Sequence, residues 1–405
     1  MAPRAATLFV LITVFIDMVG MGLVWPVLPR LIEEVSGSDL ADASIWGGWL
    51  FVAYAGMQFL FGPALGNLSD AFGRRPILLL SVFGMGIDYV ITAVAPNLIW
   101  LFIGRILAGI CGASYTIAYA YLTDITPVEG RARAFGIMGA AFGLGFIVGP
   151  AIGGLLGEFG PRVPFMTAAA LSLANFALGY FVLPETLARD LRRPFSLARC
   201  NPLATLKVFA SYRGVLPMGF VMLFYYLATS VYSAIWPFWG IARFGWSEAM
   251  IGLTLAAFGL VMAIVQGGLT GPAVKWLRER NATIFGLATA VIAAAGYGLA
   301  PNLTIVLILY LVHAPEGFVQ PALTALMTKE APDDAQGELQ GGIASLQNIG
   351  MIAGTLLFAM TFGWFMKPNP IIVSPNVGYF LSAAILTATL AYFMVRVPKA
   401  PPTRP

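Results

Sequence analysis

Ten residues decide the fold of this chain: Gly66-Asn67-Leu68-Ser69-Asp70-Ala71-Phe72-Gly73-Arg74-Arg75. They form a short hydrophilic hinge between two long apolar segments. Glycine permits a tight backbone, so Gly66 and Gly73 favour a sharp turn, and Asp70 lies close to two arginines of opposite charge. The hinge therefore predicts a tight, charged turn at a membrane surface.

The composition around the hinge is typical of an integral membrane protein. Of 405 residues, 59% are hydrophobic and 10% are charged, whereas soluble domains carry about 25% charged residues. Lipid must therefore replace water as the solvent for most of the surface. Twelve apolar runs of 19 to 25 residues are each long enough to cross a hydrocarbon core of ~30 Å as a helix. These runs are 7–29, 45–65, 77–95, 98–122, 134–156, 164–183, 215–239, 250–269, 282–300, 303–327, 341–365 and 377–395.

Basic residues predict the orientation, because Lys and Arg near helix ends are retained on the cytoplasmic side. With both termini cytoplasmic, the inner segments carry 18 of the 23 basic residues, the outer segments carry four, and Arg105 lies within a helix. The net charge of +4 is thereby explained by topology, and a nucleic-acid partner is excluded. Cys111 and Cys200 indicate neither a disulfide nor a metal site, and we expect no cofactor.

The longest polar insertion, residues 185–213, divides the chain into six helices plus six. We expect an N-terminal bundle at 1–188, a cytoplasmic linker at 189–212 and a C-terminal bundle at 213–405. The hinge has a weak similarity to a second segment, Gly267 to Pro272 followed by Lys275, Arg278 and Arg280. This similarity suggests a duplicated architecture. A transporter of two related halves carries its site between them near mid-membrane.

The hinge resembles the signature loop of the major facilitator superfamily, and further similarities extend over almost the whole chain. The fourth segment carries Leu101, Arg105, Gly109 and Gly112 at the superfamily's spacing, and Pro184-Glu185-Thr186 closes the sixth segment as in many members. The fifth segment resembles the antiporter motif of drug exporters through Gly139, Gly143, Gly149, Pro150, Gly153 and Gly154.

A narrower resemblance is to the tetracycline/proton antiporter group, through Asp17 with residues 20–29, Asp88-Tyr89 and residues 336–341. It implies an all-α membrane protein with twelve transmembrane helices in two pseudo-symmetric six-helix bundles, and secondary transport rather than an enzyme. The chain departs from that group in two places. Met262 occupies the position of the group's histidine in the eighth segment, and the ninth segment contains no acidic residue. The resemblance therefore does not assign tetracycline as the substrate.

The resemblance implies that the hinge is a cytoplasmic latch between the halves, which engages the start of the eleventh segment and the loop from Asp124 to Arg133. The alternative is a solvated loop that only obeys the positive-inside rule. The predicted gate residues are Gly66, Asp70, Gly73, Arg74, Arg75, Asp124, Arg131 and Arg133.

Glycines on neighbouring turns of the fifth segment let another helix approach closely, and Pro150 bends that helix. Gly350 and Gly354 offer a comparable small surface in the eleventh segment. Packing explains part of this pattern. The resemblance implies in addition that these helices line the domain interface and exclude proton leak.

Ionisable residues inside a bilayer are costly and are functional hypotheses by default. There are five: Asp17, Asp88, Arg105, His313 and Glu316. Asp17 lies about ten residues, or ~15 Å, into the first helix. Because desolvation disfavours the charged carboxylate, Asp17 is the first candidate for a proton carrier. A permanently hydrogen-bonded structural carboxyl is the alternative.

The other four ionisable residues form two predicted pairs. Asp88 and Arg105 fall at similar depth on antiparallel helices, so an ion pair is expected, with a structural role for Asp88 weighed evenly against transport. The resemblance implies proton coupling for Arg105. His313 and Glu316 are separated by three residues and share one helical face, with Pro315 and Pro321 loosening the helix. They can bind a proton, a substrate group, or only each other.

Aromatic and neutral polar residues in the apolar segments suggest a cavity for an amphipathic organic substrate. Some of them also suit interfacial or core packing. The predicted lining residues are Trp25, Tyr54, Gln58, Tyr115, Tyr119, Tyr225, Thr229, Tyr232, Trp236, Gln266, Gln320 and Gln347.

We therefore predict a proton-coupled antiporter that exports a drug-like molecule by alternating access. The pattern Gly-x4-Gly-Lys-Ser/Thr is absent, so ATP is not expected to supply the energy. An importer of an organic metabolite on the same fold is the nearer alternative, and a membrane enzyme acting on a lipid is a remote one. The expected partners are a small-molecule substrate, protons and the bilayer of the bacterial inner membrane, and the expected state is a monomer.

Overall fold

The structure is a computed structural model that describes residues 3–112, 114–212, 214–368 and 372–397. The predicted start of the second bundle, Arg213, and both chain ends lie outside these residues. The described part is helical and contains no β-strand, so the predicted all-α class is confirmed. Its helices up to the central linker are α1 Pro3–Val24, η1 Trp25–Val27, α2 Leu28–Ser36, α3 Leu40–Phe72, α4 Arg74–Val94, α5 Leu98–Cys111, α6 Ser114–Ile125, α7 Val128–Gly157 and α8 Val163–Val182.

The linker contains short helical turns, and long helices follow it. The linker turns are η2 Arg189–Leu191, η3 Leu197–Cys200, η4 Ala204–Leu206 and α9 Lys207–Ser211. The remaining elements are α10 Val215–Phe244, α11 Glu248–Ile264, η5 Val265–Leu269, α12 Thr270–Leu299, α13 Leu303–His313, η6 Ala314–Phe318, α14 Val319–Glu330, η7 Asp333–Ala335, α15 Gln336–Met366 and α16 Val377–Arg396.

Eleven helical stretches of the described chain are long and apolar enough to cross a membrane. The longest of them, Glu248–Leu299, has 52 residues and contains Arg278 in a non-helical conformation with φ 63° and ψ 156°. Two helices meet at this kink. Counting them separately gives twelve, in agreement with the predicted number of spans.

The helices form two compact units. Unit 1 comprises Met1–Asp39, Trp49–Asn201 and Gly245–Gly259, and unit 2 comprises Leu40–Gly48, Pro202–Phe244 and Leu260–Pro405. This division by contacts interrupts α3 and α11, whereas the division predicted from the sequence follows the central linker. The domain boundaries at 188 and 213 therefore stay a prediction, and each unit is described by itself below.

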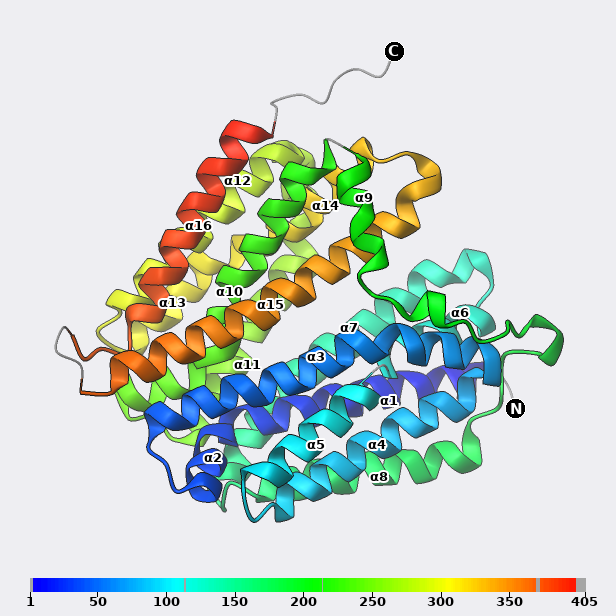
Figure 1. The fold of residues 1–405 in the computed structure, drawn as a ribbon, viewed down its shortest axis with the longest axis horizontal. Helices are drawn as coiled ribbons and strands as arrows, with labels where there is room; N and C mark the ends of the chain where they lie inside the picture. The colour runs from blue at the N-terminus through cyan, green and yellow to red at the C-terminus, as the bar shows by residue number, and fades with distance from the viewer. Residues whose placement is uncertain (1–2, 113, 213, 369–371, 398–405) are drawn as a thin grey trace. The chain divides into compact units, whose positions relative to one another are not determined.

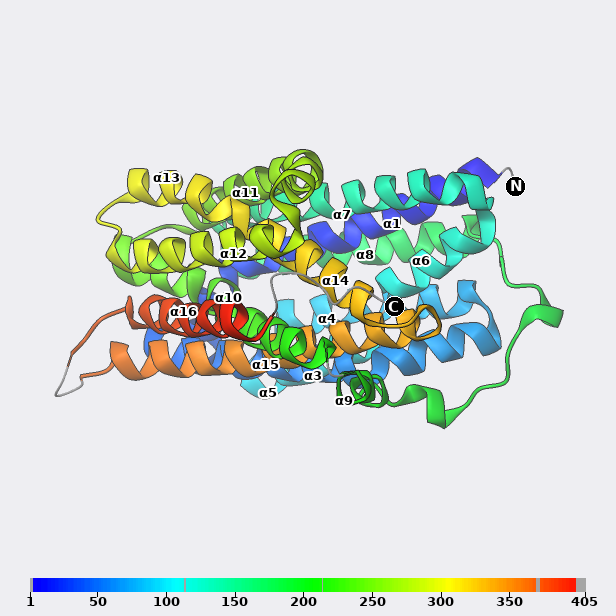
Figure 2. The same ribbon diagram turned by 90° about the horizontal axis from the view of Figure 1, so that it is seen from above.

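In unit 1, α1 packs along α7 and α8, and α4 packs against α8 and α5 (Figure 2). The close contact between α1 and α7 uses Gly145, Gly149, Gly153 and Gly157, which recur every fourth residue. A Cβ atom added to Gly149 would lie 2.8 Å from Cα of Gly22. Gly149 and Gly153 thus have the packing role that was predicted for them.

Two other glycines of the predicted antiporter motif do not take part in this packing. Gly139 and Gly143 have no neighbouring atom within 4 Å of an added Cβ, so the expectation that they admit a close helix is wrong in this structure. The physical reason is helix phase. Positions 145, 149, 153 and 157 share the face toward α1, while 139 and 143 lie on a different face.

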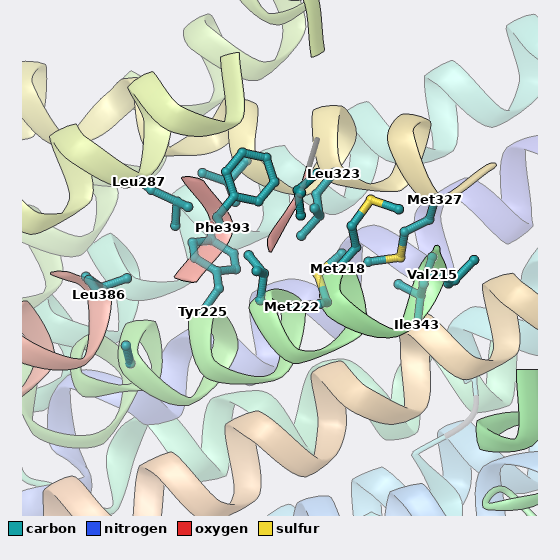
Figure 3. Close-up of a cluster of buried hydrophobic side chains, with 14 of the residues drawn as sticks. Val215, Met218, Met222, Tyr225, Leu287, Leu323, Met327, Ile343, Leu386 and Phe393 are labelled. Atoms are coloured by element: carbon teal, nitrogen blue, oxygen red, sulfur yellow. The ribbon is translucent and has the colours of Figure 1, made fainter. Parts of the chain in front are cut away.

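In unit 2, α10 runs beside α15 and α16 (Figure 1). Gly350 and Gly354 of α15 face α10, and a Cβ added to Gly350 would lie 2.7 Å from the carbonyl oxygen of Leu223. Figure 3 shows the apolar core on the other side of α10, where Met218 and Met222 meet Leu323 and Met327 of α14. The unbranched methionines fill irregular space between these helices.

Four membrane helices are interrupted near the predicted ionisable or polar residues. The first helix contains the 3₁₀ turn Trp25–Val27, and in the fourth α5 ends at Cys111 and is followed by a turn at Gly112. The eighth contains the π turn Val265–Leu269, and the tenth contains the 3₁₀ turn Ala314–Phe318. Irregular backbone at membrane depth is tolerated where it is buried in protein or lines a cavity, so these breaks indicate where the functional residues lie.

Candidate functional site

The Asp17 carboxyl group lies in unit 1 on α1 and is buried. Its partner is the side chain of Ser114, the first residue of α6 after the break in the fourth helix. The Oδ2 atom of Asp17 has no hydrogen-bond partner among the described residues. A buried polar atom without a partner is rare, so this carboxyl group is placed to take up a proton or a ligand group.

Asp88 of α4 and Arg105 of α5 form the ion pair that their similar depth predicts. Asp88 is 0% exposed, and its Oδ1 also accepts a hydrogen bond of 3.3 Å from the Thr92 hydroxyl. Both groups are thus satisfied. The pair differs in this respect from Asp17.

Tyr54 and Gln58 of α3 lie at the break in the fourth helix. The Gln58 amide donates to the carbonyl oxygen of Gly112 at 2.6 Å and to the Tyr54 hydroxyl at 3.2 Å. It therefore satisfies a carbonyl that an unbroken helix would satisfy from its own backbone. This role of Gln58 was not predicted, although Gly112 was among the residues that carry the resemblance.

His313 and Glu316 form the second buried cluster, in unit 2. They face each other through Nε2 and Oε2, which confirms that the two side chains meet. The Tyr225 hydroxyl donates to Glu316 Oε1 at 2.9 Å, and the Tyr297 hydroxyl lies 3.2 Å from His313 Nδ1. Each polar atom of the pair thus has a partner, and the tyrosines come from α10 and α12.

The predicted lining residues of α10 are divided between this cluster and an aromatic core. The ring of Tyr232 lies 4.6 Å from that of His313, and its hydroxyl has no hydrogen-bond partner in the described chain. Trp236 is 4% exposed and packs on Trp239 and Tyr297. Thr229 is half-buried. Trp236 therefore lies in a buried aromatic cluster.

Two predicted substrate residues line one cavity of unit 2, with a volume of about 340 Å³. Gln320 comes from α14 and Gln347 from α15. The remaining lining residues, which sequence reasoning missed, are Pro321, Thr324, Gln340, Ile343 and Ala344. Gln340 belongs to the segment 336–341 that carries the narrower resemblance. That resemblance is the sequence feature that could have indicated Gln340 as a lining residue.

Gln266 and Met262 lie beside the segment that carries Glu316. A Cβ added to Gly317 would approach Gln266 Cγ to 3.2 Å and Met262 Cε to 3.3 Å. The methionine at the position of the group's histidine is therefore packed against the tenth helix, where the chain's single histidine also lies.

The remaining predicted aromatic residues pack in unit 1. Trp25 meets Phe146 edge-on at 5.5 Å, and Tyr115 meets Phe142 at 5.4 Å. Tyr119 stacks on Phe135 at 4.2 Å. These contacts join the first and fourth membrane helices to α7.

The turn in the hinge is shorter than the sequence predicts. Gly66 belongs to α3 and has no neighbour within 4 Å, so the expectation that it permits a tight backbone is wrong. Gly73 is the single non-helical residue between α3 and α4, with φ 109° and ψ 158°. A Cβ there would overlap the Glu185 carboxylate. The reversal is therefore one residue long, and only glycine suits it.

Arg74 organises the charged residues around this turn. It binds Asp70 at 2.5 Å and Asp124 at 3.2 Å, and Glu185 accepts from the Arg74 backbone nitrogen at 2.9 Å. Glu185 thereby caps α4, a role that the sequence prediction missed. Arg131 donates to the carbonyl oxygen of Thr126 at 3.3 Å.

Two other predicted gate residues, Arg75 and Arg133, differ in the contacts that their side chains make. Arg75 donates to the carbonyl oxygen of Tyr180 at 2.6 Å. Among the described residues, the Arg133 side chain makes no hydrogen bond or ion pair. The network lies within unit 1, and the latch between the halves stays a prediction.

A further ion pair in unit 1 links the start of α11 to α2, which follows the first membrane helix. Arg30 lies 2.7 Å from the buried Glu248, and nearby Glu158 accepts from the backbone nitrogen of Ala249 at 3.2 Å. Hydrogen bonds from Ser247 and Ala249 lower the pKa of Glu158. Gly154 of the predicted motif packs on the Glu248 backbone, so this part of α11 is held closely to α7.

Comparison with known proteins agrees with this architecture. The sequence pattern of the Major Facilitator Superfamily matches residues 10–355. The chain belongs to the major facilitator superfamily. It is 42% identical over 357 residues to the "Tetracycline resistance protein, class C" of Escherichia coli, covering 88% of this chain and 89% of that protein.

One further relative supports the assignment, and a solved structure shares the fold. The "Tetracycline resistance protein, class G" of Vibrio anguillarum is 38% identical, with 89% of this chain and 91% of that protein covered. A crystal structure of a nucleoside transporter superposes with a TM-score of 0.79 at 14% identity, covering 99% and 100% of the two chains, and shows the fold alone. As a superfamily member, this protein is a multi-pass membrane transporter of small molecules and not an enzyme.

Proposed function

We propose that this transporter exports an amphipathic, drug-like organic molecule in exchange for protons, by alternating access in a bacterial inner membrane. The observation that carries the proposal is the buried Asp17 carboxylate, which has one unpartnered oxygen beside a broken helix. Proton uptake removes the cost of burying this charge, and the protonated oxygen becomes a donor that a substrate can use.

The substrate class follows from the lining of the described cavity. Gln320, Gln340, Gln347 and Thr324 offer donors and acceptors without net charge, next to apolar Ile343 and Pro321. Such a surface suits a molecule with several neutral polar groups on an apolar frame. The names of the relatives make tetracyclines the first compounds to test. Met262 in place of the group's histidine makes a wider panel necessary.

The direct test uses the purified transporter in proteoliposomes with an imposed pH gradient and a panel that includes tetracycline. An antiporter accumulates substrate inside vesicles whose lumen is acidic, whereas a proton-coupled importer accumulates it when the lumen is alkaline. Accumulation in the alkaline lumen would establish import and refute the proposal.

Both termini are expected on the cytoplasmic side, and one chain is expected to suffice for transport.

The role of Asp17 is tested with Asp17→Asn, which keeps the size of the side chain. We expect pH-driven accumulation to be lost and gradient-free exchange of labelled for unlabelled substrate to remain. Asp190→Asn makes the same chemical change at an exposed linker position and should transport normally. Gradient-driven accumulation by the Asp17→Asn protein would remove Asp17 from the proposed role.

A further inference from the structure

The kink at Arg278 repeats the design of the Gly73 turn, with one difference. Directly after Gly73, Arg74 pairs with Asp124 at the end of α6, and directly after Arg278, Glu279 pairs with Lys329 in α14 at 2.5 Å. The residue after the turn is basic in the first case and acidic in the second. In both cases it forms an ion pair with a residue of another helix. This likeness supports the duplication that the weak sequence similarity suggested.

The second residue after each turn strengthens the likeness. Arg75 donates to a carbonyl at the end of α8 and lies over the Tyr180 ring, 5.8 Å from its centroid. Arg280 donates to the carbonyl of Met394 in α16 and lies over the Phe393 ring, also at 5.8 Å. Both arginines tie the turn to the last helix of the same half.

The difference is the residue at the turn itself. Arg278 has φ 63° and ψ 156°, and it is the one non-glycine residue with positive φ in the described chain. Side chains rarely adopt this backbone conformation, and the corresponding residue of the other half is glycine. The turn itself therefore does not explain why an arginine occupies this position.

The surroundings of Arg278 supply that reason. Its side chain is exposed, as is that of Lys275 one turn earlier, and within the described chain neither makes a hydrogen bond or salt bridge. Both line a cavity of about 670 Å³ between α12 and Pro321 of α14. The other lining residues are Thr270, Gly271, Val274 and Glu279.

The acidic and hydroxyl side chains that line this cavity already have partners within the protein. Glu279 is bound by Lys329, and the Thr270 hydroxyl donates to the carbonyl oxygen of Val265 at 3.0 Å. The remaining polar groups of the lining side chains are therefore two cations. They favour an anion with oxygen acceptors, such as a phosphate group.

The position of the cavity at a membrane surface indicates that the anion belongs to a lipid. The cavity lies at the end of a membrane-spanning helix, and Trp276 of the same helix, which does not line the cavity, is 84% exposed. An exposed tryptophan at the end of a membrane helix is typical of the headgroup level. Acyl chains anchor a lipid phosphate at this level, whereas a free anion has no such anchor.

We propose that Lys275 and Arg278 bind the phosphate of an anionic phospholipid headgroup in this cavity. The bound lipid compensates two exposed cations and offsets the strain at Arg278. The site lies wholly within unit 2 and is separate from the Asp17 and His313 clusters.

The test is native mass spectrometry of the full-length protein in detergent, titrated with phosphatidylglycerol or with phosphatidylcholine. Lys275→Ala combined with Arg278→Gly removes both cations and gives the turn the residue found in the other half. We expect the first phosphatidylglycerol to bind the double variant roughly tenfold more weakly or worse, because each basic residue contributes about fivefold. Phosphatidylcholine binding should not change.

Arg189→Ala combined with Arg193→Ala is the matched control, because it removes two exposed cations from the linker. Equal phosphatidylglycerol binding by the cavity variant and the wild type would overturn the proposal. Displacement of the lipid by millimolar inorganic phosphate would also overturn it, because it would show a site for free anions. A thermal midpoint of the cavity variant at or above that of the wild type will show that lost binding does not reflect unfolding.

Discussion

Asp17 in unit 1 and Glu316 in unit 2 are both buried carboxylates beside an interrupted membrane helix, yet their surroundings differ. Glu316 is bound by His313 and by the Tyr225 hydroxyl, so both of its oxygens are occupied. Asp17 has Ser114 as its side-chain partner, and its Oδ2 is unpartnered. The difference separates a carboxylate whose two oxygens have partners from one that keeps an unpartnered oxygen, and the proton-coupling roles predicted for both stay predictions.

The Asp88–Arg105 pair resembles the Glu316 cluster more than it resembles Asp17. Asp88 is fully buried and receives a second hydrogen bond from Thr92. A buried pair of this kind contributes little net stability, but removal of one partner leaves a buried charge. Four substitutions rank these groups by how strongly the fold depends on them.

The largest effect is expected for Arg105→Met, which leaves the Asp88 carboxylate without its cation. Breaking a buried ion pair in this way costs about 3–5 kcal/mol, to be measured as the free energy of unfolding in a denaturant titration in detergent. The control is Arg105→Met combined with Asp88→Asn, which should recover most of the loss. An equally unstable double variant would show that Arg105 stabilises the fold by packing.

Glu316→Ala should have the next largest effect, because it leaves Tyr225 and His313 without their shared partner. Each stranded buried group costs about 1–3 kcal/mol, so roughly 2–4 kcal/mol of unfolding free energy should be lost. Glu338→Ala, at an exposed position of α15, serves as the control and should change the free energy little. A small effect of Glu316→Ala would place Glu316 with Asp17 as a group that the fold does not need.

Tyr225→Phe removes one hydroxyl from the Glu316 cluster and leaves the ring. Because the loss leaves Glu316 Oε1 buried without this partner, it should lower the free energy of unfolding by about 1–3 kcal/mol. The neighbouring Tyr226→Phe is matched in size and position, and it has no hydrogen bond to lose in the described chain. Similar values for the two variants would argue against the Tyr225–Glu316 bond.

Asp17→Asn should have the smallest effect on stability, within about 0.5 kcal/mol, because Ser114 can bond to the amide as well as to the carboxyl group. The same variant should lose pH-driven transport completely. Measuring unfolding and transport on one preparation separates the two roles. A loss of more than about 2 kcal/mol would identify Asp17 as a structural carboxyl group.

Residue identity and spacing were sufficient for much of this site. Charges inside apolar segments are rare because burial is costly, so the five ionisable residues could be found directly. The depth of Asp88 and Arg105 predicted their pairing, and the three-residue spacing of His313 and Glu316 predicted that they meet. Ser114 and Tyr297, which complete the Asp17 and His313 clusters, could not be found this way because they come from other helices.

The glycines show the limit of sequence patterns. A spacing of four places residues on one helical face, but the spacing does not say which face meets a neighbour. Gly145 and Gly157 contact α1 and its continuation, whereas Gly139 and Gly143 contact nothing. Trp236 is a similar case, because its apolar segment is clear from the sequence and its aromatic surroundings include Tyr297 and Tyr310 from two other helices.

The sequence by itself determined the membrane class, the twelve helices, the charged turn and the buried ionisable residues. These properties depend on the composition and length of single segments, since lipid tolerates neither unpaired backbone nor stray charge. Only the tertiary structure decided that the turn is one residue long, that Asp17 keeps an unpartnered oxygen and that Arg278 opens onto a cavity. Each of these depends on distances between helices far apart in the sequence, which no single segment encodes.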